Sequence, residues 1–116
     1  MADISVADGT LRLTMSAIER LESLHGDLAF PLASVESVEV VEHPLDVAHG
    51  FRLGTGVPGT MVIGSITGGG VKSFAVVHSE TERGIVVRLD GQGFDQIIIG
   101  TAEPEDLASR ITAPRS

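Results

Sequence analysis

The chain has 116 residues, of which 42% are hydrophobic and 21% are charged, and this composition predicts one folded domain rather than a disordered tail. Sixteen acidic against eight basic residues give a formal net charge of −8, which repels phosphate groups and disfavours nucleic acid, phosphoinositide and membrane partners. The chain contains no cysteine, which excludes disulfides, thiolate metal sites and cysteine nucleophiles.

The composition also favours a small β-rich domain in the cytoplasm. Fourteen glycines indicate many turns, and runs of valine and isoleucine fill the stretches between them. The N-terminal residues carry neither a basic segment nor a long apolar one, so no signal peptide is expected. No apolar run approaches the roughly 20 residues that a membrane-spanning helix needs.

The clearest local pattern is a β-hairpin over residues 4–15 with its turn at Asp8-Gly9. Aspartate followed by glycine is favoured in a two-residue hairpin turn because both positions must accept a positive φ. This turn predicts a register that gathers four apolar side chains on one face, pairing Val6 with Leu11 and Ile4 with Leu13.

A helical pattern follows the hairpin. Ser16 and Glu19 form a capping box, which predicts a short additional helix near residues 16–25. Residues 27–31 are expected to be extended. Residues 35–42 alternate in part between valine and glutamate, which predicts a strand with one solvated face.

The second half of the chain is typical of strands. Residues 43–59 are turn-rich and predict no element, and Pro44 argues against a helix at their start. Four strand-like runs follow, at residues 61–66, 73–78, 84–89 and 95–99. Their regular spacing predicts an antiparallel meander. Ile97-Ile98-Ile99 does not alternate, so we expect the last strand to be covered on both faces.

The chain ends with a helical pattern at residues 103–111. Pro104 suits a first helical position, and the acidic residues after it complement the positive end of the helix dipole. Leu107 and Ile111 lie on one face and can dock the helix on a sheet. No linker divides the chain, so we expect a single domain over residues 1–112 and a loose tail at 113–116.

Four segments in this order carry a resemblance to a known family: 31–35, 54–59, 91–95 and the acidic-proline-acidic start of the last helix. The chain resembles small bacterial pleckstrin-homology-like domain proteins of the actinobacterial type, over about residues 11–111. The resemblance implies a mainly β fold, a barrel of about seven antiparallel strands capped by one C-terminal α-helix. Members of the group are mostly uncharacterised, so the resemblance implies a fold and almost no function.

Residues 54–59 match the pattern G-x-G-x-x-G, but we do not expect them to bind a nucleotide. A dinucleotide fingerprint needs a helix after the loop, whereas a predicted strand follows here, and Pro58 removes a backbone donor. An interaction loop is the better hypothesis, because Val57 and Pro58 can form an apolar tip. The candidate residues are Arg52, Gly54, Thr55, Gly56, Val57, Pro58 and Gly59.

No catalytic residue, cofactor site or metal site is predicted. His43, Asp46 and His49 have the residue types of a metal site, but Pro44 opposes a helix that would organise them, and ordinary loop polarity explains them. Lipid-binding members of the pleckstrin-homology superfold hold phosphates with lysine and arginine in the first strand-strand loop. The corresponding turn at Asp8-Gly9 has no cation and carries an acid.

We therefore expect a non-catalytic protein-interaction or assembly domain. The resemblance implies a groove between an open strand edge and the C-terminal helix that can accept an added strand, with self-association as a special case. Two alternatives stay open. One is a small-molecule carrier or sensor with an apolar pocket inside the barrel, and the other is a metal-dependent hydrolase using the histidines at 43 and 49.

Overall fold

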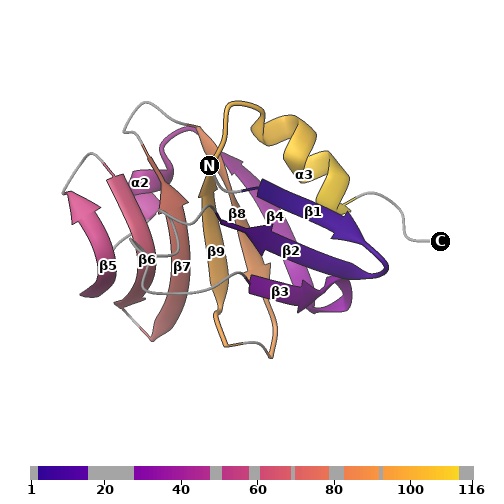
Figure 1. Cartoon of the computed structure of the whole chain (residues 1–116), viewed down its shortest axis with the longest axis horizontal. Helices are drawn as coiled ribbons and strands as arrows, with labels where there is room; N and C mark the ends of the chain where they lie inside the picture. The colour runs from indigo at the N-terminus through magenta and orange to yellow at the C-terminus, as the bar shows by residue number, and fades with distance from the viewer. Residues whose placement is uncertain are drawn as a thin grey trace.

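The structure is a computed structural model that describes residues 3–15, 28–47, 51–57, 61–68, 70–78, 83–91 and 93–112. The chain folds into two β-sheets and a C-terminal helix (Figure 1). The prediction of a mainly β fold ending in a helix is confirmed. The predicted helix near residues 16–25 and the predicted tail at 113–116 lie outside the described residues.

The smaller sheet contains three antiparallel strands in the order β1-β2-β3: β1 (Asp3–Ala7), β2 (Thr10–Thr14) and β3 (Leu28–Pro31). Asp8 and Gly9 both have positive φ, at 53° and 72°, as a two-residue hairpin turn requires. The predicted register is confirmed, since the Cα partners include Val6 with Leu11 and Ile4 with Leu13.

The larger sheet contains six strands in the order β4-β8-β9-β7-β6-β5. These are β4 (Val35–Val41), β5 (Phe51–Val57), β6 (Met61–Gly68), β7 (Val71–Val77), β8 (Gly84–Leu89) and β9 (Gln96–Gly100). The prediction of an antiparallel meander is wrong, because β9 lies between β7 and β8 and pairs with β7 in parallel. Alternation of side chains determines which faces a strand buries, but not which neighbours it takes.

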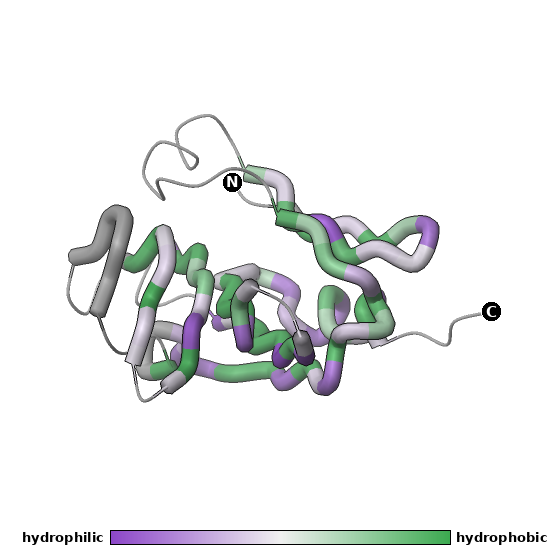
Figure 2. The backbone as a smooth tube through the Cα atoms, turned by 90° about the horizontal axis from the view of Figure 1, so that it is seen from below, coloured by the Kyte–Doolittle hydropathy of each residue, from purple (hydrophilic) through white to green (hydrophobic). Residues whose placement is uncertain are grey.

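The two sheets form separate layers rather than the closed barrel of about seven strands that the resemblance implied. No strand pairing joins them among the residues that the structure describes, and Figure 2 shows the layers from the side. The large sheet also contains β5, which the sequence pattern left as a turn-rich stretch. Its Gly54 and Gly56 have low strand propensity, yet both lie in the ladder with β6.

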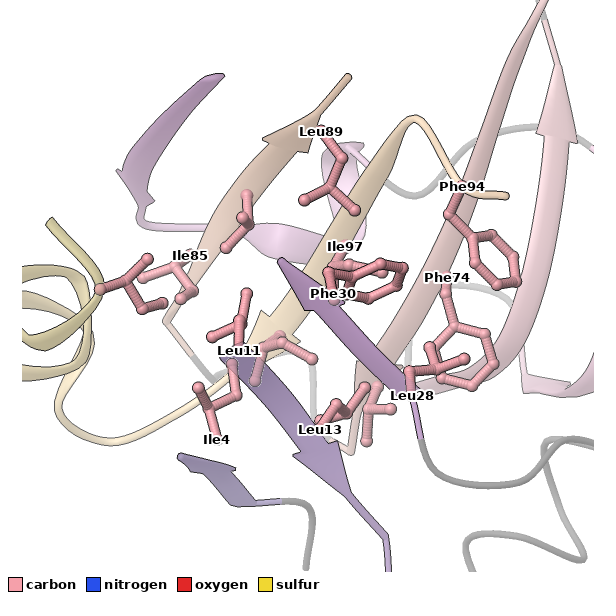
Figure 3. Packing of buried hydrophobic residues seen from close by; sticks show 14 of the residues in the cluster. Ile4, Leu11, Leu13, Leu28, Phe30, Phe74, Ile85, Leu89, Phe94 and Ile97 are labelled. Carbon is pink, nitrogen blue, oxygen red and sulfur yellow. The ribbon is translucent and has the colours of Figure 1, made fainter. Parts of the chain in front are cut away.

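The main core lies between the two sheets. Side chains of Ile4, Leu11 and Leu13 from the small sheet face Ile85 and Ile97 of the large one (Figure 3). β9 is buried on both faces, as predicted: Ile97, Ile98 and Ile99 are 2%, 0% and 2% exposed. Ile98 belongs to a second cluster on the opposite face, with Val62, Ile66, Ala75, Val77 and Val86.

The predicted C-terminal helix is confirmed as α3 (Pro104–Thr112), which starts at Pro104 and buries Leu107 and Ile111. α3 packs against β4, β8 and β1, so it closes one side of the two layers. Two short helical segments, η1 (Leu32–Ser34) and α2 (Pro44–Val47), flank β4. The expectation that Pro44 opposes a helix was wrong, because proline is well accepted at the first helical position. In the described part of the chain, no helix is long and apolar enough to cross a membrane.

Candidate interaction edge

The sequence-predicted interaction residues lie largely in a strand. Residues 52–57 belong to β5, which pairs with β6 without a register shift from Phe51 to Val57, so the predicted loop is a strand over this part. Pro58 and Gly59 lie outside the described residues. The strand β6 follows, so the G-x-G-x-x-G pattern does not lead into the helix that a dinucleotide fingerprint requires.

Contacts at Lys72 show which backbone groups of each strand face which neighbour. The Lys72 amide donates to Oδ2 of Asp95 at 2.8 Å, and its carbonyl accepts from the Asp95 amide at 2.7 Å. Lys72 therefore faces the β9 side and makes no ladder bond to β6. Its Cα partner Thr67 must likewise face away from β7, toward β5.

The same alternation sets the orientation of β5. Phe51 is the partner of Thr67, so the N–H and C=O groups of Phe51 point toward β6. Every second residue then does the same, while Arg52, Gly54 and Gly56 point their backbone groups away from the sheet. Two of these three residues have no side chain. β5 thus directs a row of backbone donors and acceptors away from β6, on a side where no other described strand pairs with it.

The opposite edge of the large sheet is protected. β4 contacts α3, carries the exposed residues Glu36 and Glu39, and has a register irregularity between Val35 and Ser37. Covering helices, charged side chains and bulges are features that prevent a sheet edge from pairing with another chain. β4 therefore does not offer a docking edge comparable to β5.

The small sheet also lacks a comparable edge among its described strands. β1 packs against α3. β3 has only four residues and ends at Pro31, which has no N–H to donate. β5, by contrast, has seven residues and pairs only with β6 among the residues described. β5 equals β4 in length, and in the described part of the molecule it lacks the covering helix and the register irregularity of β4.

An ion-pair network formed by Arg83 and two glutamates lies near β4 and α3. Arg83 donates through Nε to Glu42 Oε2 at 2.9 Å and through its terminal nitrogens to the carboxylate of Glu105. The Arg83 hydrogen bonds hold the pKa of Glu105 below its usual range, and the two carboxylates raise the pKa of Arg83 further. All three side chains are solvent-exposed, so this ion pairing orients the start of α3 and adds little stability. Sequence reasoning missed this network because its members are more than 20 residues apart.

The structure describes only part of the set of histidine and aspartate residues considered for a metal site. His43 is exposed just before α2, Asp46 lies within α2, and His49 falls outside the described residues. Within the described ranges, no group of three or more histidine or acidic side chains could hold a metal ion. The geometry therefore adds no support to the hydrolase alternative.

The space between the sheets is occupied by packed side chains (Figure 3). Phe74 and Phe94 meet edge to face with ring centroids 5.4 Å apart, and Lys72 Nζ lies 5.1 Å from the centroid of the Phe94 ring. Phe30 lies in the same cluster at 6% exposure. This packing is what a folded core requires, and it gives the carrier alternative no support.

Comparison with known proteins adds no assignment, since no family model, no curated protein and no solved structure matches the chain.

Proposed function

We propose that this chain is a non-catalytic protein-interaction or assembly module that binds an extended protein segment along β5. The observation that carries the proposal is the outward row of backbone donors and acceptors at Arg52, Gly54 and Gly56. An added strand obtains affinity from such main-chain hydrogen bonds and specificity from its alternate side chains.

The proposal places the docking edge away from the C-terminal helix. The resemblance to pleckstrin-homology-like proteins implied a groove between an open strand and that helix. Here α3 packs at β4, at the other end of the six-stranded order from β5. The mainly β body and its C-terminal helix support membership of that group, while the two open sheets and the central position of β9 differ from its barrel.

Gly54→Pro is the variant that tests the proposal. Proline removes the N–H of residue 54, which points outward, and leaves the bonds of Leu53 and Thr55 to β6 in place. We expect Gly54→Pro to lose the partner captured by the wild-type chain. The control Gly54→Ala keeps the N–H and should retain the partner. Equal partner binding by wild type and Gly54→Pro would contradict the proposal.

Amide hydrogen exchange provides a second readout. In the free protein at low concentration, the amides of Leu53 and Thr55 should exchange slowly because they bond to β6. Those of Arg52, Gly54 and Gly56 should exchange rapidly and become protected when the partner binds. Protection that does not follow this alternating pattern would show that the partner binds elsewhere.

A further inference from the structure

We propose that the strand received by β5 is the β5 strand of a second copy of this chain, in antiparallel orientation about a two-fold axis at Gly54. This inference rests on the proposed function, because it names the partner of the same edge. Pairing of this kind would join the two large sheets into one continuous sheet. The contact is isologous, which means that both copies use the same strand, so the assembly ends at a dimer.

The register follows from the alternation within β5. With the axis at Gly54, this residue faces Gly54 of the second copy, and Arg52 faces Gly56. All three residues direct their N–H and C=O groups outward. Each opposed pair is therefore of the hydrogen-bonded type, in which both residues exchange N–H···O bonds. This register satisfies every outward group of residues 52–56 on both copies.

Other symmetric registers satisfy fewer groups. With the axis at Arg52 or at Gly56, the only hydrogen-bonded pair within residues 52–56 is the axis residue opposite its own counterpart in the second copy. The axis at Arg52 also brings two like charges directly opposite each other, which is destabilising in a sheet. With the axis at Gly54, the two Arg52 residues are four positions apart along the strands, or about 14 Å. That separation exceeds the screening length of about 10 Å in ordinary buffer.

The distribution of acidic residues is compatible with self-pairing despite the net charge of −8. β5 contains no acidic residue, whereas Glu36 and Glu39 of β4 and Glu105 of α3 are exposed at the opposite end of the sheet. Five strand spacings separate β4 from β5, which amounts to about 24 Å. Two copies joined at β5 therefore hold these acidic edges at the far ends of the joint sheet.

The mass of the untagged full chain in solution is the first test, measured from micromolar to millimolar concentration by sedimentation. We expect a transition from 12.1 kDa to about twice that mass, shifted to lower concentration by added salt, which screens the remaining repulsion. Gly54→Pro should remain monomeric throughout, and Gly54→Ala should dimerise. A monomeric wild type at all concentrations overturns the inference, as does a Gly54→Pro variant that dimerises like wild type.

Cross-linking tests the register, because the chain has no native cysteine. In the proposed pair, residue 52 of one copy and residue 56 of the other have Cα atoms about 5.5 Å apart, within disulfide range. A mixture of Arg52→Cys and Gly56→Cys proteins should form a disulfide-linked heterodimer, while Arg52→Cys alone should not cross-link. Cross-linking of Arg52→Cys with itself as fast as in the mixture overturns the register.

The two proposals fail differently. A monomeric wild type that still loses a captured partner on Gly54→Pro substitution would overturn the second-copy inference and leave the proposed function intact. A captured partner and a dimer that are both insensitive to Gly54→Pro would overturn both.

Discussion

Replacing Gly84 with alanine should destabilise the fold by about 3 kcal/mol. Gly84 opens β8, and a Cβ added there would lie 2.2 Å from the carbonyl oxygen of Ile99 and 3.1 Å from Cγ of Pro44. Carbon-oxygen contacts between strands are about 3.3 Å or longer, so β8 and β9 would have to separate locally by about 1 Å. The nearest atom is backbone, which has no alternative rotamer to relieve the clash.

The magnitude follows from the hydrogen bonds that such a separation lengthens. The Thr101 amide donates to the Arg83 carbonyl at 2.8 Å beside the Gly84–Gly100 pair. An added 1 Å takes this bond beyond hydrogen-bonding distance. Loss of about two such bonds, at about 1–3 kcal/mol for each group left unsatisfied, gives the estimate of about 3 kcal/mol.

Urea unfolding followed by circular dichroism measures this change, since the chain has no tryptophan or tyrosine to report by fluorescence. The midpoint should fall with the m-value unchanged. Gly93→Ala is the matched control, because a Cβ at Gly93 meets no atom within 4 Å. Its effect should stay within about 0.5 kcal/mol. A Gly84→Ala protein within 1 kcal/mol of wild type, about a third of the expected loss, would refute the close β8–β9 approach as the constraint.

Two further substitutions probe the core and the α3 network. Ile98→Ala should lower the free energy of unfolding in urea by about 2–5 kcal/mol, because Ile98 is 0% exposed in the central strand β9. The control Val71→Ala should lower it by less than about 0.5 kcal/mol, because Val71 is 40% exposed. Similar losses at both positions would contradict the buried position of β9. Glu105→Gln should reduce the pH dependence of stability in acid. The Arg83 bonds lower the folded-state pKa of Glu105, so its contribution is complete above about pH 4.3, the unfolded value, and is lost as the pH falls through the lower folded value. For each protein, the change in the urea midpoint from its value at pH 7 is measured from about pH 5 to pH 3. If wild type and Glu105→Gln show the same change, the Arg83–Glu105 pairing does not form in solution.

Features determined by neighbouring residues could be predicted from the sequence. The hairpin register follows from Asp8-Gly9, and the start of α3 follows from Pro104 with acidic residues behind it. The burial of β9 on both faces was also visible, because three successive isoleucines leave no polar face. In each case one short segment contains all the information that the prediction needs.

Features set by distant partners could not be predicted. Nothing in the β7, β8 or β9 segments indicates that β9 inserts between the other two, because all three are apolar on both faces. β5 was missed since its glycines are typical of turns, although they accommodate strand pairing here. An interaction role for residues 52–57 stays a prediction, and their place in a strand became visible only through the pairing with β6.

The central position of β9 has a consequence for synthesis of the chain. The strand that joins β7 to β8 is the last of the nine described strands to leave the ribosome, so the two segments of the large sheet stay separate until residues 96–100 emerge. Until then β7 and β8 each expose an apolar edge, which is the kind of surface that makes nascent chains prone to aggregate. Early termination upstream of β9 would divide the sheet at its centre instead of shortening it at one end.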